Sequence, residues 1–514
     1  MQKYPSIFLE KFHITKNGDI ERRKLVEHYF SKKLNLSNGV SVMKPTIKYL
    51  SQEEILYIHN QSLLMLSEIG MKMPHEETLA LLKSAGADIV DGNIVKFSEK
   101  MVESALATVP KRDEVVLYAR DPAQDIRFNT HDPSLACMTM AVNVMDPHTQ
   151  LKRPATNEDL AVLTRMADQL DNVGVNGGLV TPQEVPGAYN DWYTWATTIK
   201  NTTKHITGGM FGARCVQDAA KMASIALGGE AEFRKRPFIS GWVLTLPPFG
   251  ISSETIDSMV EMNRWNIPAI VSSGPILGTS SPITIAGTIA QAHAEILACI
   301  VVSQLVNPGS PIIYTSFARG IDMKTGNISM ACPEFGILKV AMSQMGRHLD
   351  LPIRMPSLLR DAKVLDAQAG FETGMIGTMG GMAADLLDSM QLDMDMVVDF
   401  ADLVFCDECM AGIKRVAKEL VVDSSTIAMD VMKNVGPGGN FLAQPHTFQN
   451  FRKELWMPEL LERRNWDLWE QDGAKDIYTV ARERMLEMIK ATPENRLSPS
   501  IEKEIDNIVD QAQV

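Results

Sequence analysis

The alternation of short apolar segments with longer helical segments after about residue 133 constrains the fold more than any other feature. Eight apolar segments have the length of buried strands, and helical stretches of about a dozen residues or more separate them. Such alternation is typical of βαβ units, and eight units match a closed barrel better than an open, doubly wound sheet. The sequence therefore predicts an α/β fold, a (β/α)8 TIM-type barrel. The predicted strands are 137–143, 173–180, 205–210, 238–244, 269–273, 312–317, 353–358 and 389–393.

The rest of the chain divides into three further segments by composition and pattern. Residues 1–42 mix charges without an amphipathic repeat, so we expect an N-terminal arm there. A helical and hairpin N-terminal extension is expected over 43–132, followed by the barrel over 133–421. Residues 422–514 form a predicted C-terminal helical segment that is rich in Trp, and we expect it to cover the barrel or to join subunits.

Local signals support the N-terminal extension. Ser51 followed three residues later by Glu54 is a capping box at the start of an apolar helical pattern. Asp91 and Gly92 lie between two β-branched runs, which is typical of a tight hairpin turn. We therefore expect one long helix followed by a small hairpin between two shorter helices.

Charge and hydropathy exclude several classes of protein. The 50 Lys and Arg against 63 Asp and Glu leave a net charge of −13, which argues against nucleic acid as the main partner. No apolar run reaches the 18 or so residues that a membrane helix needs, so we expect no membrane span. Six cysteines are too sparse for a disulfide framework and favour a reducing compartment. We therefore expect a cytoplasmic globular protein.

Function should lie at the carboxyl ends of the strands, because barrel enzymes build their sites from the loops that follow them. Trp242, Tyr314 and Phe317 fall at such strand ends. Aromatic faces there can hold a quaternary ammonium group by cation–π attraction, worth about 0.5–2 kcal/mol per ring. Packing at the barrel rim is the alternative interpretation, and the pattern favours neither.

Other motifs point to no further chemistry. Cys406 and Cys409 have the spacing of half a zinc site, but no second Cys pair and no nearby His completes it. We expect them as buried thiols at the start of a helix over 407–420. The glycines of 436–439 lack the Lys-Ser or Lys-Thr of a phosphate loop.

Three stretches resemble the trimethylamine:corrinoid methyltransferase superfamily. They are TSFARGIDMKTGNISMACPEFGILKVAMSQMGRHLDLP, RMPSLLRDAKVLDAQAGFETGMIG and VGPGGNFLAQPHTFQNFRKELWMPELLERRNWDLWEQDGAKD. The likeness extends from about residue 46 to about residue 481, in the order that the family has.

The resemblance implies a non-pyrrolysine branch of that superfamily, because Leu359 stands where founding members carry pyrrolysine. Characterised members of this branch demethylate quaternary amines such as glycine betaine, proline betaine, carnitine and γ-butyrobetaine. The implied methyl acceptor is the Co(I) corrinoid of a separate partner protein. No cobalamin-binding Asp-x-His-x-x-Gly occurs, so this chain itself is expected to bind no cofactor and no metal.

The resemblance and the strand-end positions together give the expected site. Trp242, Tyr314 and Phe317 would contact the trimethylammonium group, with Glu334 as a counter-charge and Leu359 as an apolar wall in the space of pyrrolysine. The remaining expected substrate contacts are Arg319, Arg354 and Arg360 for a carboxylate, and, at lower rank, Asn143, Asn176 and His205. As an alternative, Arg319 or Arg360 pairs with Asp322 or Asp361 in the same loops.

We therefore predict a methyltransferase that moves one methyl group from a quaternary amine, glycine betaine or a related betaine, to the Co(I) corrinoid of its cognate partner protein. One alternative is a zinc-dependent methylcorrinoid:thiol methyltransferase, which requires Cys406 and Cys409 to converge with a third ligand. The other is a barrel that binds a betaine without turnover. The apolar content and the Trp-rich tail lead us to expect a homo-oligomer.

Overall fold

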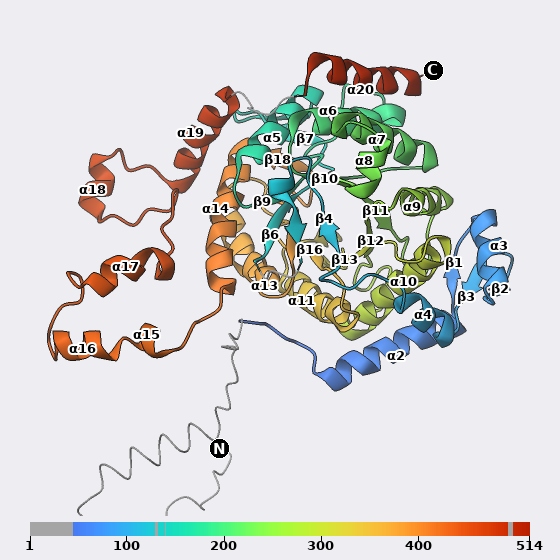
Figure 1. Cartoon of the computed structure of the whole chain (residues 1–514), viewed down its shortest axis with the longest axis horizontal. Coiled ribbons are helices and arrows are strands. Elements are labelled where there is room, and N and C mark those ends of the chain that lie inside the picture. The colour runs from blue at the N-terminus through green and yellow to red at the C-terminus, as the bar shows by residue number, and fades with distance from the viewer. Residues whose placement is uncertain (1–44, 129–131, 139, 492–496, 514) are drawn as a thin grey trace, which may run out of the picture. The chain divides into compact units, whose positions relative to one another are not determined.

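Eight parallel strands form the centre of the protein, and helices surround them (Figure 1). The computed structural model describes residues 45–128, 132–138, 140–491 and 497–513. The barrel strands are β6 (Ser134–Cys137), β9 (Val173–Gly177), β10 (His205–Gly208), β11 (Ile239–Leu244), β12 (Ala269–Ser273), β13 (Ile312–Ser316), β16 (Arg354–Pro356) and β17 (Leu386–Asp388). They are hydrogen-bonded in the order β13-β12-β11-β10-β9-β6-β17-β16. A parallel bridge between Tyr314 and Ile353 joins the two ends, so the sheet closes.

The TIM-type barrel predicted from the sequence is confirmed, with two strands misplaced. The first strand ends at Cys137, where 137–143 was predicted, because the chain leaves the barrel there and forms β7 (Asn143–Met145) in a separate sheet. The eighth strand is β17, before the predicted 389–393. Leu386 and Leu387 extend the apolar helical spacing of the segment before them, although the helical residues end at Gly381.

The outer layer consists of the helices that connect the strands. They are α5 (Asn157–Gln169), η2 (Gly187–Tyr189), α6 (Asn190–Asn201), α7 (Ala213–Leu227), α8 (Glu230–Lys235), α9 (Ser253–Trp265), α10 (Ile285–Val306), α11 (Pro333–His348), α12 (Ala367–Glu372), the π-helical η3 (Thr373–Gly377), α13 (Thr378–Gly381) and α14 (Phe400–Ala417). A short hairpin, β14 (Gly320–Ile321) with β15 (Ile328–Ser329), follows β13.

Helix α10 is apolar on all sides. Within the described chain it alone is long and apolar enough, by length and composition, to cross a membrane, and 83% of its most apolar window is buried inside the protein. It packs between β12 and the N-terminal extension. Such a helix is hydrophobic all round because protein covers every face.

The N-terminal extension has the long helix, the hairpin and the two shorter helices that were predicted: α2 (Gln52–Glu68), α3 (Glu76–Ser84), β2 (Asp88–Val90), β3 (Ile94–Lys96) and α4 (Glu99–Leu106). It also has elements that were not predicted: β1 (Met71–Lys72), β4 (Val116–Leu117), η1 (Pro122–Gln124) and β5 (Ile126–Arg127). The capping box of Ser51 and Glu54 is present, and Asp91 and Gly92 take the left-handed conformations that the β2–β3 turn needs.

The β4–β5 hairpin closes the amino-terminal end of the barrel. Val115, Leu117 and Phe128 pack in one buried cluster with residues of the barrel interior, among them Val175 and Ile313. This end is therefore filled by side chains, and a ligand has to approach from the carboxyl ends of the strands.

The carboxyl-terminal part of the chain is helical. The large compact unit comprises Pro45–Lys418 and Asp430–Val514, and Glu419–Met429 belongs to a second unit that contains α15 (Ser424–Ile427). The other helices are α16 (Met429–Val435), α17 (Pro445–Glu454), α18 (Trp466–Gln471), α19 (Ile477–Lys490) and α20 (Pro499–Ala512). Helix α19 packs on α14, and α20 packs on α6 and α7. The four segment boundaries given above stay a prediction, and the arm over 1–42 lies outside the described residues.

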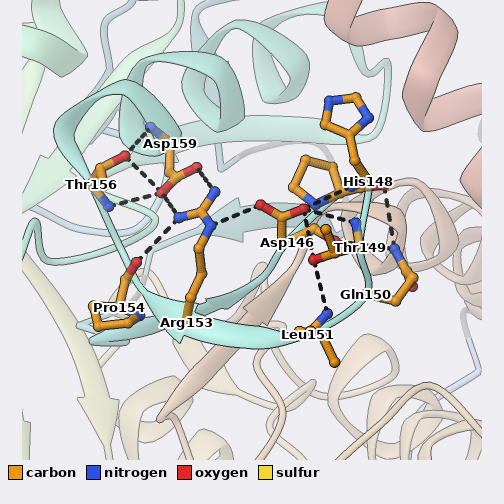
Figure 2. Close-up of polar contacts among 10 residues, drawn as sticks. Asp146, His148, Thr149, Gln150, Leu151, Arg153, Pro154, Thr156 and Asp159 are labelled. Atoms are coloured by element: carbon orange, nitrogen blue, oxygen red, sulfur yellow. Dashed lines mark hydrogen bonds and ion pairs between the residues drawn. The ribbon is translucent and has the colours of Figure 1, made fainter.

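An ion-pair network fixes a second sheet beside the barrel mouth (Figure 2). This sheet joins β18 (Val397–Asp399), β7 and β8 (Lys152–Pro154). Arg153 donates to Asp146 at 2.8 Å and to Asp159 at 2.6 and 2.8 Å, and Thr156 caps α5 beside it. The hydrogen bond from Arg153 holds the pKa of Asp146 well below its usual range. The turn between β7 and β8 is thereby attached to the start of α5.

A buried carboxylate joins the extension to the last strands. Asp385 accepts hydrogen bonds from Arg112 at 2.7 Å, from Arg347 at 2.6 and 2.7 Å and from the backbone N–H of Ile353 at 2.8 Å. Burial alone would raise the pKa of Asp385, but Arg347 and Arg112 outweigh it and hold the pKa below the ordinary value. The carboxylate is therefore charged and fully paired.

We predict that Asp385→Ala lowers the free energy of unfolding by about 3–5 kcal/mol, because it leaves two arginines without their shared partner. Denaturant unfolding followed by circular dichroism measures the change. The matched control is Asp506→Ala, which removes a surface ion pair with Lys200 and should cost at most about 1 kcal/mol. Equal effects of the two substitutions would contradict the buried role of Asp385.

Three histidines lie where α2 packs on α10 and α11. His293 contacts the Tyr314 hydroxyl at 2.9 Å through Nδ1 and His59 at 3.0 Å through Nε2, and the His348 ring centroid is 5.2 Å from that of His59. Burial, with a contribution from His348, lowers the pKa of His59 to about 4. Burial also lowers the pKa of His293 and of His348. All three are therefore neutral in the folded protein at neutral pH.

We predict that acid weakens the attachment of α2 through these groups. Because their folded-state pKa values are depressed, the unfolded chain binds more protons below about pH 6.5, so stability is full above that pH and falls toward pH 4. His59→Gln should reduce the loss of unfolding free energy between pH 7 and 5 by about 1 kcal/mol, allowing for solvent screening. Denaturant titrations at both pH values measure it, with His148→Gln, at an exposed histidine, as the control.

Candidate functional site

A cavity of about 370 Å³ opens at the carboxyl ends of the strands. Its walls come from the segments that follow β6, β10, β11, β12, β13 and β17. Most of the lining is apolar, and it includes Met138, Met140, Met210, Leu244 and Met330. Since the other end of the barrel is plugged, this cavity is the candidate site.

Aromatic rings form part of the cavity wall. Trp242, on β11, and Phe317, after β13, lie with ring centroids 5.6 Å apart and planes tilted by 59°. The indole N–H of Trp242 donates to the sulfur of Met138 at 2.6 Å, which fixes the ring. Phe211, 41% exposed, lies at the rim and also lines an adjacent cavity of about 690 Å³. Trp242 and Phe317 thus occupy the positions expected for them, and their contact with substrate remains a prediction.

Arg319 also lines the cavity, and buried neighbours hold its loop. The fully buried Lys339 donates to the carbonyls of Ser316, at 2.5 Å, and Ala318, at 2.8 Å, on either side of Phe317. A Cβ at Gly274 would lie 3.4 Å from Nη1 of Arg319, so glycine leaves room for the guanidinium group. The loop therefore presents Phe317 and Arg319 from a fixed base.

The charge of Arg319 is only partly compensated. Burial lowers the pKa of Arg319, and Asp395 acts in the opposite direction. Its buried Nε has no hydrogen-bond partner among the described residues. Asp395 lies on the same cavity wall, in the loop after β17. The two alternative partners proposed from sequence are otherwise engaged: Asp322 caps its own turn, and Asp361 accepts from Ser329 and Met330.

Small hydroxyl side chains complete the polar part of the wall. Ser272 is 1% exposed, and its buried Oγ has no partner within the described chain. Thr245 instead donates to Glu295 at 2.6 Å. Burial raises the pKa of Glu295, while Thr245, Phe249 and further donors counter it. Glu295 thus anchors the loop after β11, and Ser272 offers a free donor to a ligand.

Two of the expected carboxylate-binding arginines are occupied by protein groups. Arg354 pairs with Asp388 at 2.8 Å inside the barrel, with its guanidinium carbon 4.7 Å from the Trp242 ring centroid. Arg360 is fully buried and pairs with Asp402 on α14, not with Asp361. The prediction that they bind a substrate carboxylate is wrong, because both are buried outside the cavity lining and pair with carboxylates farther along the chain.

Four other expected site residues lie away from the cavity. Tyr314 points from β13 into the helical layer, where its hydroxyl meets His293. Asn176 donates to the carbonyl of Thr164 and to Thr202 behind β9. The last two are Asn143, which pairs β7 with β18, and His205, which is held between the Tyr118 carbonyl and Ser240 at the amino-terminal end of β10. Burial lowers the pKa of His205 to about 4.

Glu334 and Leu359 are also displaced from the expected positions. Glu334 is exposed in the first turn of α11, where it complements the helix dipole. It is therefore no counter-charge in the cavity. Leu359 is 1% exposed and packs behind the wall with Met330, Phe335 and Phe317. It supports the apolar wall from the second layer and does not itself line the cavity.

The structure also brings residues to the site that the sequence interpretation missed. They are Met138, Phe211, Ser272 and Asp395. Ser272 and Asp395 fall in strand-end segments that the barrel pattern marks as functional, so that rule could have named them. The chain offers no spacing that pairs Asp395 with Arg319, because they follow different strands.

The expected half of a zinc site is not completed. Cys406 and Cys409 lie in the middle of α14, not at its start, and Cys406 is buried beside Arg360 and Asp402. Burial raises the pKa of both thiols. The described residues contain no group of three His, Cys, Asp or Glu side chains that could hold a metal ion. The geometry therefore gives the zinc-dependent alternative no support.

Comparison with known proteins places the chain among methyltransferases. The trimethylamine methyltransferase MttB of Desulfitobacterium hafniense is 29% identical over 466 residues, which cover 90% of this chain and 93% of that protein. The glycine betaine methyltransferase of the same species is 27% identical over 466 residues, which cover 90% of this chain and 95% of that protein. Both relatives thus match nearly end to end.

A solved structure shares the fold, and a family model covers nearly the whole chain. The monomethylamine methyltransferase MtmB of Methanosarcina barkeri has the same fold, with a TM-score of 0.50 at 12% identity over 86% of this chain and 89% of that chain. The family model for trimethylamine methyltransferase (MTTB) matches residues 17–513. The chain therefore belongs to the trimethylamine methyltransferase (MTTB) family.

Proposed function

We propose that this protein transfers a methyl group from a quaternary amine, a betaine, to the Co(I) corrinoid of a separate partner protein. The observation that carries the proposal is the lining of the cavity. Aromatic rings, methionines and one arginine whose Nε has no partner among the described residues surround a space at the barrel mouth. This combination suits a ligand with an apolar cationic end and an anionic end.

Methyl transfer from a quaternary amine requires few catalytic groups from the protein. A quaternary nitrogen is already cationic and leaves as a neutral amine, so transfer of its methyl group needs no general acid. A neutral tertiary amine would have to be made cationic first. The protein then has to orient the methyl carbon and exclude water, which is a matter of position and electrostatics. The apolar lining around Trp242 and Phe317 serves both purposes.

The cationic end is assigned to the aromatic wall. Trimethylammonium donates no hydrogen bonds, so ring faces and methionine sulfurs attract it without requiring a directed partner. Arg354 lies over the Trp242 ring, so that face is already occupied. The exposed part of Trp242, together with Phe317, remains for the ligand.

The anionic end is assigned to Arg319. Its guanidinium group lies on the wall with Nε unpaired, and the hydroxyl of Ser272 is a second donor without a partner. A carboxylate that binds both groups would satisfy two buried polar atoms at once, and leaving such atoms unpaired costs about 1–3 kcal/mol each. A betaine therefore fits this cavity better than a tertiary amine without a carboxylate.

The non-pyrrolysine assignment belongs to this proposal. Leu359 packs against Phe335 in an apolar cluster with Met330 and Phe317, which carry the cavity wall. A leucine behind the cavity wall supplies no group that could bind and activate an uncharged amine. This supports a substrate whose nitrogen is already quaternary.

The methyl acceptor is proposed to come from the partner. When bound over the mouth, its Co(I) corrinoid supplies the nucleophile that accepts the methyl group. This chain contributes the open rim, where Met140 is 47% exposed and Leu246 is 59% exposed. We place the reaction in the cytoplasm, which the unpaired state of all six cysteines supports, and expect a homo-oligomer.

A methyl-transfer assay tests the proposal. Purified protein, reduced corrinoid carrier and one amine at a time are mixed, and the absorbance change on methylation of Co(I) is followed. The amines are trimethylamine, glycine betaine, carnitine, γ-butyrobetaine and proline betaine. Methylation by at least one betaine and not by trimethylamine is the expected result. Betaine binding without methylation by a competent carrier would favour the non-catalytic barrel instead.

We predict that Trp242→Ala raises the apparent KM for the betaine substrate about 5- to 30-fold, since one aromatic contact is worth about 1–2 kcal/mol. Trp242→Phe keeps an aromatic face and should retain most of the affinity. Steady-state kinetics in the same assay measure both variants. Unchanged KM in Trp242→Ala would remove Trp242 from the binding site.

A further inference from the structure

We propose that Asp395 and Arg319 act together as a selector for zwitterions, in which Asp395 faces the quaternary nitrogen and Arg319 faces the carboxylate. The inference rests on the proposed function and deepens it. It adds a specificity-determining residue, Asp395, and states the class of amine that the site rejects: quaternary cations that lack an anionic group.

The first observation is the charge of the cavity wall. Arg319 and Asp395 are its charged side chains among the described residues, one of each sign. The other ionic groups near the mouth are already neutralised, since Arg354 pairs with Asp388 and Arg360 with Asp402. The charged groups of the cavity wall therefore sum to zero, with the positive charge on Arg319 and the negative charge on Asp395.

The second observation is the backbone that carries Asp395. Asp393, Met394 and Asp395 follow one another with φ of 54°, 55° and 75°, all in the left-handed region. Residues with side chains rarely adopt this conformation singly, and three in succession require the surrounding structure to hold them. Such strained turns cluster at ligand-binding sites. This turn ends on the one acidic side chain of the cavity wall.

The third observation is how this turn is held. The N–H of Asp393 donates to the carbonyl of Ala362 at 2.8 Å, and that of Met394 donates to the carbonyl of Arg360 at 3.0 Å. The Arg360 side chain donates to the carbonyl of Met390 at 2.6 Å. Arg360 is thus a positioning residue: it holds the turn from both sides and contacts no ligand.

The sheet beside the mouth holds the other end of the turn. The N–H of Asn143 donates to the carbonyl of Met396 at 3.3 Å, directly after Asp395, and β7 pairs with β18. Figure 2 shows how Arg153 ties the β7–β8 turn to α5 through Asp146 and Asp159. The backbone on both sides of Asp395 is therefore held by hydrogen bonds to neighbouring segments.

Electrostatics then favours a zwitterion. A quaternary nitrogen cannot donate a hydrogen bond, so a carboxylate attracts it through charge alone, at an orientation that the ligand is free to choose. A carboxylate-free cation near Asp395 would also meet the charge of Arg319, which Asp395 compensates only in part, and like charges in a desolvated site are costly. A betaine places a positive charge near Asp395 and a negative charge near Arg319, so it should bind more tightly than tetramethylammonium.

The test is a binding measurement that needs no corrinoid. Isothermal titration calorimetry of the full chain with glycine betaine, γ-butyrobetaine and tetramethylammonium gives three dissociation constants. We expect at least one betaine to bind at least about tenfold more tightly than tetramethylammonium, a difference of about 1.4 kcal/mol. No preference for either betaine would overturn the proposal.

Two variants separate the roles. Arg319→Gln should weaken betaine binding at least about tenfold and strengthen tetramethylammonium binding, because the repelling charge is gone. Asp395→Asn should weaken both ligands. If Asp395 only orients Arg319, Asp395→Asn will weaken the betaine and leave tetramethylammonium unchanged, which would overturn its role at the nitrogen.

A matched control and a second readout complete the design. Asp393→Asn removes a charge from the same turn, where Asp393 pairs with Lys363, and should leave the affinity ratio unchanged. An equal change in this control would also count against the proposal. Thermal unfolding shows that each variant is folded. Because binding is measured without the carrier, a failed methyl-transfer assay with an intact affinity ratio would reject the proposed function and keep the selector.

Discussion

The buried ion pair between Arg360 and Asp402 is the interaction on which the barrel mouth depends. Both side chains are fully buried, so neither charge can be left alone without a large cost. Burial opposes the charge of each group and raises the pKa of Asp402, whereas each partner acts in the opposite direction on the other. Through this pair α14 is joined to the segment after β16, and through the Met390 carbonyl to the loop after β17. A residue that meets no ligand thus sets the geometry of the cavity wall.

Two buried ion pairs next to the cavity, Arg354 with Asp388 and Arg360 with Asp402, leave few charged groups for a ligand to meet. Arg354 pairs with Asp388 in the barrel interior beside Trp242; burial raises the pKa of Asp388, and Arg354 acts in the opposite direction. The rest of the wall is mostly apolar surface with two charges of opposite sign, Arg319 and Asp395. Such a site is suited to holding and orienting a charged ligand, and transfer of a methyl group from a quaternary nitrogen requires little more.

Sequence reasoning predicted the barrel because strand and helix periods are local properties of the chain. It placed Phe317 and Arg319 at the mouth because they follow a strand directly. It misplaced Tyr314 although strand alternation alone separates it from Ile313, which faces the barrel interior. The partners of Arg354 and Arg360 follow 34 and 42 residues later, and nothing in the local pattern relates them. Long-range pairing was therefore the part that only the structure supplied.

The two charged residues of the cavity wall lie in loops after different strands. The substrate specificity of the site therefore depends on loop residues, whereas the stability of the barrel depends on its strands and helices. Arg319 is held by Lys339 and Asp395 by the turn beside Arg360, so either loop can change while the barrel remains intact. A simple tertiary amine carries no carboxylate that could pair with an arginine at this position. A betaine carries one. Relatives named for trimethylamine and for glycine betaine align over about 90% of this chain. One barrel can serve both kinds of substrate if the difference lies in a few loop side chains, because the reaction itself requires only that the methyl group be held in place.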